Sequence, residues 1–220
     1  MLNLPNVTLI VLTSVHIASN VSAMKKSCAG IKYGSVKFIS DIMPDNLPEY
    51  AKYESCPKLT YEGFSEYTFL HLHTHIETEF ALLVHHDGFV INPDLWTDEF
   101  LEYDYIGAPW AYTPSVFTTS YGEVVEVGNA GVCIRSKKLL TLPTQLNLSL
   151  IYQNGSCADD VNYCVHYRNT FLENGMKYAP KELAAKFSTE TWIPGISTES
   201  FAFHGICGPE EKMRFVSPHL

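Results

Sequence analysis

Several short motifs that mark large enzyme classes are missing from this chain of 220 residues. It has no G-x-G-x-x-G or G-x-x-x-x-G-K-[ST] glycine loop, which argues against Rossmann dehydrogenases and P-loop enzymes. It also lacks the G-x-S-x-G elbow of α/β-hydrolases and the H-E-x-x-H zinc motif. Basic residues are scarce, with 15 Lys and Arg against 24 Asp and Glu. The net charge of −9 therefore predicts no nucleic-acid partner, because such a surface repels phosphate.

The chain has no C-x-x-C pair and no apolar run long enough to cross a bilayer. Its apolar segment Val7–Ile17 is short and has no basic residue before it, so we expect a buried strand rather than a signal peptide or a membrane span. We expect a cytoplasmic protein whose cysteines are reduced and whose N-x-[ST] sequons are chance matches. The residues concerned are Cys28, Cys56, Cys133, Cys157, Cys164 and Cys207, and Asn6, Asn20, Asn147 and Asn154.

The remaining composition is that of a folded domain, with 46% hydrophobic and 18% charged residues. We expect one domain over residues 1–220, of the α/β class, with a mostly parallel central sheet flanked by helices. Strands are predicted at Val7–Thr13, Val36–Asp41, Phe80–Val84, Tyr103–Ile106, Val132–Ile134 and Phe201–Gly205. Helices are predicted at Ala18–Ala29 (ending near Gly30), Ser65–Thr78, Asp94–Leu101, Ser136–Leu142 and Asp159–Tyr167, with an irregular connection at Pro44, Pro48 and Pro57 and a long aromatic loop from Trp110 to Gly122.

Four polar groups stand at the predicted strand ends or helix starts: Asp87, the turn of Asn129 with Gly131, the pair Asp159 and Asp160, and His204. The carboxyl ends of parallel strands meet at one edge of a sheet, where α/β proteins bind ligands, so we expect these groups to share one cleft. The alternative is that each is only a turn or a helix cap.

Asp87 and His204 make a plausible pair of metal ligands. A carboxylate and an imidazole with open positions suit Mn²⁺, and also Mg²⁺ if phosphate oxygens complete the shell. A cation would also let a chain of net charge −9 accept an anionic substrate. If the pair Asp159 and Asp160 is functional, we expect it to supply a general base that removes a proton from an acceptor hydroxyl.

The histidine-rich stretch around His71, His73 and His75 raises the alternative of a zinc site. His71 and His75 would share a face of the predicted helix. A solvated helix face explains the same pattern without a metal.

Taken together, the motifs resemble GT-A-type glycosyltransferases, and most closely a family of compact GT-A-like proteins that carries a domain-of-unknown-function label. The family pattern D-G-F-V-x-N-P-x-x-W is present at 87–96, and E-Y-D-Y-I-G-A-P-W at 102–110. G-N-x-G follows at 128–131, D-D-V in place of E-D-V at 159–161, and F-x-F-H-G at 201–205. The resemblance spans nearly the whole chain.

This resemblance implies a single GT-A-like domain that moves a hexosyl or deoxyhexosyl group from a UDP-, GDP- or dTDP-sugar to the hydroxyl of a glycan or other acceptor, with Mn²⁺ or Mg²⁺. It implies Asp87 and His204 as metal ligands, Asp160 as the base of an inverting reaction, and Asp159 as a residue near the acceptor. Donor contacts implied in the same way are Thr13, Ser14, Val15, Asp41, His86, Gly88, Asn129, Ala130 and Gly131.

One departure from the GT-A pattern concerns the D-x-D metal motif, because His85 occupies the position of its first Asp. This motivates two alternatives to a metal-dependent transferase. One is a non-catalytic nucleotide-sugar or glycan-binding module with a degenerate metal site. The other is a zinc hydrolase that uses the histidine stretch.

Overall fold

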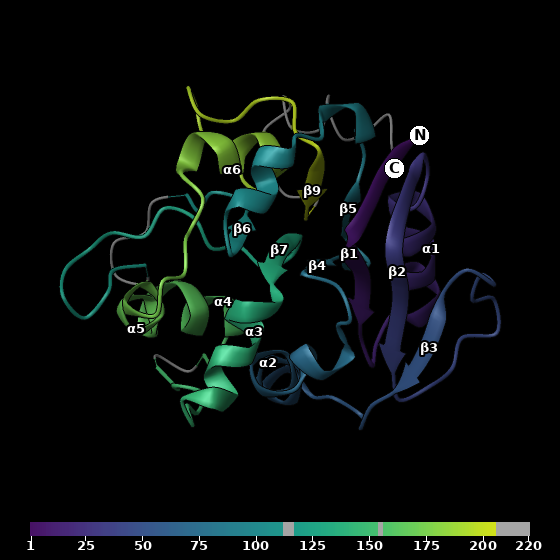
Figure 1. Ribbon diagram of the computed structural model, residues 1–220, viewed down its shortest axis with the longest axis horizontal. Helices are drawn as coiled ribbons and strands as arrows, with labels where there is room; N and C mark the ends of the chain where they lie inside the picture. The colour runs from purple at the N-terminus through teal and green to yellow at the C-terminus, as the bar shows by residue number, and fades with distance from the viewer. Residues whose placement is uncertain (112–116, 154–155, 206–220) are drawn as a thin grey trace.

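A six-stranded mixed sheet forms the centre of the protein, in a computed structural model that describes residues 1–111, 117–153 and 156–205 (Figure 1). In sheet order its strands are β3 (Lys52–Ser55), β2 (Ile31–Ser40), β1 (Leu2–Leu12), β4 (Phe80–Leu83), β7 (Cys133–Ser136) and β6 (Tyr105–Gly107). The first four are parallel to one another, whereas β7 is antiparallel to both of its neighbours. The predicted α/β class with a mostly parallel sheet is confirmed.

A second, three-stranded sheet lies beside the first and has the order β5 (Gly88–Val90), β9 (Ala202–His204), β8 (Ser188–Thr189). The strand expected at Phe201–Gly205 is therefore present as β9, but it does not belong to the central sheet. Its register places His204 directly opposite Gly88. This pairing brings His204 next to the segment that leaves β4.

The two faces of the central sheet build two hydrophobic cores, because successive side chains of a strand point to opposite faces. In β1, Val7, Leu9 and Val11 belong to one core, and Ile10 and Leu12 to the other. The first core is covered by α1 (Ile17–Ser27) and α6 (Lys181–Phe187). The second is covered by α2 (Tyr61–Leu70), α3 (Lys137–Gln145) and α5 (Arg168–Glu173).

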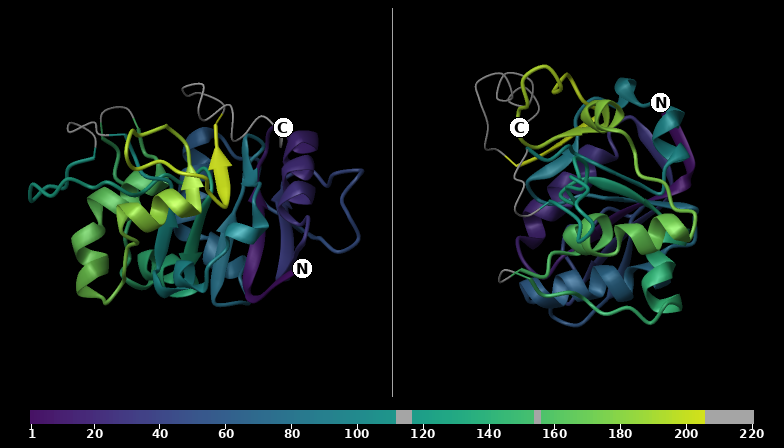
Figure 2. Two further views of the ribbon diagram at one scale, coloured as in Figure 1. Left: turned by 90° about the horizontal axis from the view of Figure 1, so that it is seen from above. Right: turned by 90° about the vertical axis from the view of Figure 1, so that its left-hand side faces the viewer.

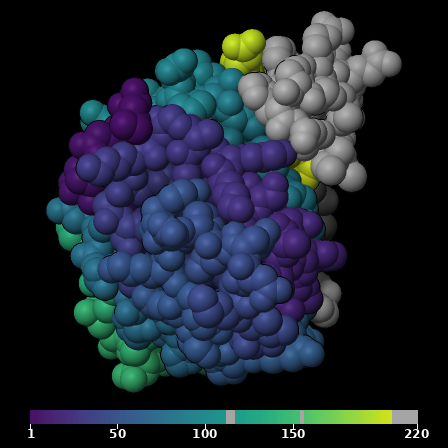
Figure 3. Space-filling model, turned by 90° about the vertical axis from the view of Figure 1, so that its right-hand side faces the viewer, coloured from purple at the N-terminus to yellow at the C-terminus, as the bar shows by residue number. Residues whose placement is uncertain are grey.

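The views of Figure 2 show this arrangement, with α6 on one side of the central sheet and α2 and α3 on the other. The N-terminal segments, coloured purple to blue, form most of the side that Figure 3 presents. No helix in the described ranges is long and apolar enough to cross a membrane.

Helix α1 agrees with the predicted Ala18–Ala29, and Gly30 follows it with φ +76°, a conformation that glycine adopts without strain. The expectation of one helix over Ser65–Thr78 was wrong. The helix ends at Leu70, and a 3₁₀ turn follows over Leu72–His75. This tighter turn brings the His75 ring to Glu54 at the end of β3.

Three other expectations also need correction. The connection marked by Pro44, Pro48 and Pro57 is not wholly irregular, since it contains the edge strand β3. The helix expected at Asp94–Leu101 is instead two 3₁₀ turns, Pro93–Leu95 and Asp98–Glu102, separated by Trp96 and by Thr97, which caps the second. The predicted helix Asp159–Tyr167 begins as α4 (Asp159–Val161) and widens into a π-helix over Asn162–His166.

Five cysteines lie in the described residues, and all five are free thiols. Cys207 and the sequon at Asn154 lie outside those residues, as does part of the predicted aromatic loop.

Candidate active site

Asp87 and His204 face each other across the junction of the two sheets. The chain leaves β4, turns through His85 and His86, and enters β5 directly after Asp87. The Oδ1 atom of Asp87 lies 3.6 Å from Nε2 of His204. Both side chains keep part of their surface open to solvent. The close contact with the His204 imidazole lowers the pKa of Asp87 far below its usual range, although burial acts in the opposite direction.

The other ring nitrogen of His204, Nδ1, lies 3.0 Å from Oε1 of Glu190, directly after β8. The imidazole therefore stands between two carboxylates. Burial opposes its protonation, but Asp87 and Glu190 outweigh that effect and raise the pKa of His204 to about 9. Glu190 lies in no recognisable motif and was not among the predicted site residues.

The turn before β7 packs directly against this imidazole. A β-carbon at Gly131 would lie 2.0 Å from the His204 ring, so only glycine leaves room for it. Within the turn, the Gly131 N–H donates to Oδ1 of the buried Asn129 at 3.0 Å. The Tyr105 hydroxyl donates to the carbonyl of Gly128. The turn is thus fixed by one hydrogen bond within it and by a second one from Tyr105 of β6.

Asp160 joins the same turn from α4. Its Oδ2 accepts a hydrogen bond from the Ala130 N–H at 3.2 Å, and its Oδ1 accepts one from the Val161 N–H at 2.8 Å. Burial and the nearby charge of Asp159 raise the pKa of Asp160 to about 7, although Arg135 acts against this shift. A carboxyl group with a pKa near neutrality is suited to exchange a proton with a bound substrate.

Asp159 is placed differently from its neighbour. Its carboxylate is buried and pairs with Arg135, whose Nη2 lies 2.6 Å from Oδ2 of Asp159. Arg135 is fully buried on β7, between the rings of Tyr105 and Tyr163. No motif predicts a role for this arginine, and its only signal in the sequence is that it is a basic residue inside the apolar run of β7.

The end of β1 borders the site on its other side. Thr13 accepts hydrogen bonds from the Val15 N–H at 3.1 Å and from Nδ2 of Asn20 at 3.3 Å. His16 follows with φ 51° and stacks on the exposed His86, with 4.4 Å between the ring centroids. This stack links the end of β1 to the turn that carries Asp87.

Two more of the predicted donor residues flank this end of the sheet. Ser14 accepts a hydrogen bond from the Leu59 N–H at 2.9 Å, just before α2. Asp41 follows the last residue of β2, and Val15 is exposed. Nearly all predicted site residues are therefore gathered at one edge of the sheet, and Asp41 stands at the margin of the group.

The pair Asp87 and His204 fits a divalent cation in its spacing. Two ligand atoms bonded at about 2.1 Å to one cation lie roughly 3 to 4 Å apart, and the observed separation is 3.6 Å. His85, at the position of the first Asp of D-x-D, is largely buried and stays neutral, because burial lowers its pKa to about 4. In the described ranges no three His, Cys, Asp or Glu side chains form a group that could hold a metal, so the remaining ligands would come from substrate and water.

The histidine stretch does not form a site of its own. His75 is bonded to Glu54 through Nδ1 and to the Tyr67 hydroxyl through Nε2 at 2.8 Å. Lys37 completes this network with 2.6 Å between its Nζ and Oε1 of Glu54. His71 is exposed at the end of α2. The stretch therefore serves to join α2 to β2 and β3.

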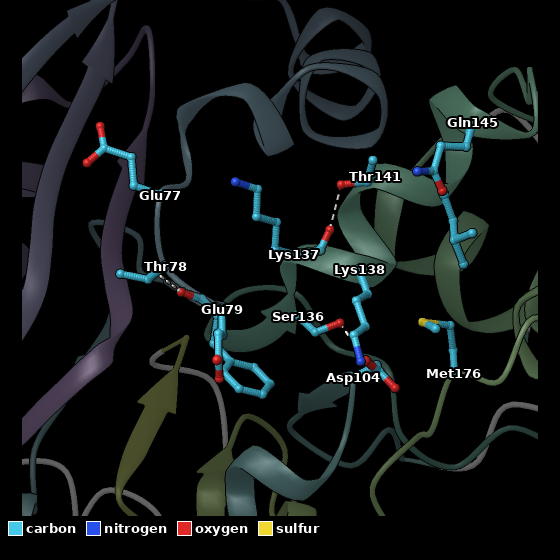
Figure 4. Close-up of a pocket in the computed structure, with 12 residues that line it drawn as sticks. Glu77, Thr78, Glu79, Asp104, Ser136, Lys137, Lys138, Thr141, Gln145 and Met176 are labelled. Atoms are coloured by element: carbon cyan, nitrogen blue, oxygen red, sulfur yellow. Dashed lines mark hydrogen bonds between the residues drawn. The ribbon is translucent and has the colours of Figure 1, made fainter.

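A cavity of about 740 Å³ opens at the opposite edge of the central sheet, where β4 begins and β7 ends (Figure 4). Lys137, Lys138 and Thr141 of α3 line it, together with Glu77 and Glu79 of the segment before β4. The hydroxyl of Thr141 donates to the carbonyl of Lys137. None of the predicted site residues lines this cavity.

Comparison with solved structures finds similar folds among glycosyltransferases. The chain is similar to an active-site mutant of LgtC, with 11% identity, a TM-score of 0.53, and coverage of 92% of this chain and 88% of that one. The galactosyltransferase LgtC in complex with donor and acceptor sugar analogs is similar with 12% identity, a TM-score of 0.51, and coverage of 91% and 87%. At this identity the likeness shows the GT-A fold.

A mannosyltransferase from Pyrobaculum calidifontis, solved with GDP-Man and Mn²⁺, is similar at a TM-score of 0.47 and 10% identity, and covers 81% of this chain and 55% of that one. That similarity is too distant to support an inference.

No curated protein matches the chain in sequence. A family model does match, over residues 60–204, which include every strand of the second sheet and the Asp160 turn. The chain belongs to the family described as "Protein of unknown function (DUF5672)".

Proposed function

We propose that this protein is a metal-dependent glycosyltransferase that moves a sugar from a nucleotide-sugar donor to an acceptor hydroxyl with inversion at the anomeric carbon. One observation carries the proposal. The turn that binds Asp160 through the Ala130 N–H also packs, through Gly131, against the His204 ring. A candidate base and a candidate metal-ligand pair thus adjoin the same three-residue turn. The similarity of the fold to the galactosyltransferase LgtC supports the same activity class.

In this proposal, Asp87 and His204 hold Mn²⁺ or Mg²⁺ against the donor diphosphate. The cation would supply positive charge that stabilises the diphosphate as it leaves. Asp160 accepts the proton of the acceptor hydroxyl while that oxygen attacks the anomeric carbon. The bond from this carbon to the diphosphate oxygen breaks, and positive charge develops on the sugar ring as in glycoside hydrolysis.

The other residues have binding and positioning roles in the proposal. Thr13, Ser14 and Val15, with Asp41 at the margin, receive the nucleotide at the end of β1. His86 and Gly88 flank the diphosphate beside Asp87, and the Asn129–Gly131 turn contacts the donor sugar. Asp159 is engaged with Arg135, so we assign it to positioning Asp160 rather than to contact with the acceptor.

The proposal is tested with Asp160→Asn. The isosteric amide keeps the shape of the side chain and can keep one of its two accepted hydrogen bonds, but it cannot accept the proton. We expect loss of sugar transfer and unchanged binding of the donor with Mn²⁺, measured by product analysis and by calorimetry. If Asp160→Asn turned over normally, the assignment of the base would be wrong.

The second candidate function is a nucleotide-sugar or glycan-binding module without turnover. Two observations favour it: His85 replaces an acidic ligand, and no three His, Cys, Asp or Glu side chains in the described residues are arranged to hold a metal. Such a module would bind its ligand equally well with EDTA present. Donor binding that requires Mn²⁺ would exclude it.

A further inference from the structure

We propose that Glu190 is the positioning residue of the candidate metal site, which it serves by orienting the His204 imidazole. This inference rests on the proposed function, since it concerns the cation that Asp87 and His204 would hold. It adds to the site a residue that neither the motifs nor the comparisons with other proteins indicate.

The three-stranded sheet places the side chains in a row. His204 ends the central strand β9, Asp87 directly precedes β5 on one side, and Glu190 directly follows β8 on the other. The register of β8 and β9 pairs Thr189 with Phe203, so that Glu190 and His204 are next to each other. The order carboxylate, imidazole, carboxylate is therefore built into the pairing of these strands.

The hydrogen bond to Glu190 determines which nitrogen of His204 is available. Nδ1 faces Oε1 of Glu190 at 3.0 Å, and Nε2 faces Oδ1 of Asp87 at 3.6 Å. A cation bound on the side of Asp87 would take the place of the proton on Nε2, while the proton on Nδ1 stays donated to Glu190 and keeps the Nε2 lone pair directed toward that cation. Histidines that bind metals commonly use this arrangement, and losing the carboxylate partner weakens metal binding by about 10- to 100-fold.

The imidazole ring of His204 has little room to rotate into another orientation. Gly131 lies against one side of it, and a β-carbon at Gly88 would come within 3.0 Å of its Cδ2 atom. The carboxylate of Glu190 is itself only partly exposed, at 29% of its side-chain surface. The pairing is therefore a fixed contact within the sheet and not a surface ion pair.

The experiment measures binding of Mn²⁺, by the loss of its free electron paramagnetic resonance signal, to protein already saturated with UDP or with GDP. We expect the Kd for Mn²⁺ to rise about 10- to 100-fold in Glu190→Ala. Glu190→Asp should recover part of the affinity. The matched control is Glu199→Gln, an exposed carboxylate on the segment leading into β9, and it should bind Mn²⁺ like the wild type.

The possible outcomes distinguish a wrong assignment of Glu190 from a wrong assignment of the metal site. If the wild type binds Mn²⁺ and Glu190→Ala binds it equally well, the role of Glu190 is refuted and the proposed function stands. If the wild type binds nucleotide but no Mn²⁺, the inference and the metal in the proposed function both fail. Circular dichroism melting without metal identifies a variant that merely unfolds, and in that case Glu190→Asp decides by the same criterion.

Discussion

Gly131 and His204 come so close that a β-carbon on residue 131 would lie 2.0 Å from the imidazole ring. The turn before β7 and the last strand of the second sheet are thus fitted to each other without space between them. The roles proposed for Asp160 and His204 depend on this contact, because it places the candidate base and the candidate metal ligand beside one turn.

Replacing this glycine is the first prediction. Gly131→Ala must displace the His204 ring or the turn, and either movement would strain the hydrogen bonds that the ring makes to Glu190 or that Gly131 makes to Asn129. We expect donor binding with Mn²⁺ to weaken at least about tenfold, as for the loss of an orienting contact at a metal site. Calorimetric titration of the donor in the presence of Mn²⁺ measures this loss of affinity. In the control Gly63→Ala the new β-carbon approaches no atom more closely than Oγ1 of Thr60, at 3.3 Å, and binding should not change. Normal binding by Gly131→Ala would contradict the packing described here.

The second prediction concerns pH. Asp160 must be ionised to accept a proton, and its pKa is raised to about 7 by burial and by Asp159, against the effect of Arg135. Sugar transfer should therefore rise as the pH increases toward 7. Asp159→Asn removes the neighbouring negative charge and leaves Arg135 to act on Asp160, so the acidic limb of the kcat/KM profile should move to lower pH. An unmoved limb would show that Asp160 is not the group that titrates.

The third prediction concerns stability as a function of pH. The folded-state pKa of Asp160 lies above the ordinary value of 3.8, so the folded state holds this proton more tightly than the unfolded state does. The favourable contribution is present at low pH and is lost as the pH rises toward 7. Asn cannot titrate, so the stability of Asp160→Asn relative to the wild type should rise between about pH 4 and pH 7 in urea unfolding. A constant difference would mean that the carboxyl group is not perturbed by folding.

The buried pair Arg135 and Asp159 gives the fourth prediction. Removing one partner of a buried ion pair leaves an uncompensated charge and typically costs about 3–5 kcal/mol. We expect Arg135→Met to lower the free energy of unfolding by about this amount. The double variant Arg135→Met with Asp159→Asn should recover part of it.

The control for that measurement is Arg168→Met, which breaks a pair with Glu123 that is partly open to solvent. Such pairs contribute about 0 to 1 kcal/mol. Equal losses in Arg135→Met and Arg168→Met would contradict the assignment of Arg135 to the core.

The strands were the best-predicted part of the fold, because their signal is local. The apolar run around Leu9 and Ile10 alone indicates a buried strand, and β1 serves both cores. The helix expected at Ser65–Thr78 failed for a reason that lies elsewhere in the chain. It ends early because His75 turns to meet Glu54, and no local pattern reports a partner 21 positions away.

The same distinction applies to the candidate site. Asp87, Asp160 and His204 stand in recognisable motifs, and the structure brings them together. Arg135 and Glu190 could not be found in this way, since each is defined only by its partner: Asp159 for the first and His204 for the second. Their partners are set by strand pairing and by packing between distant segments.

The central claim is that this site binds a nucleotide-sugar donor through a divalent cation, and one calorimetric experiment tests it most directly. UDP, GDP, dTDP and their common sugars would each be titrated into the protein with Mn²⁺ and then with EDTA. The account predicts that one nucleotide binds with Mn²⁺, and that this binding is lost with EDTA and in His204→Ala. Binding that persists with EDTA, or no binding by any of these nucleotides, would contradict it.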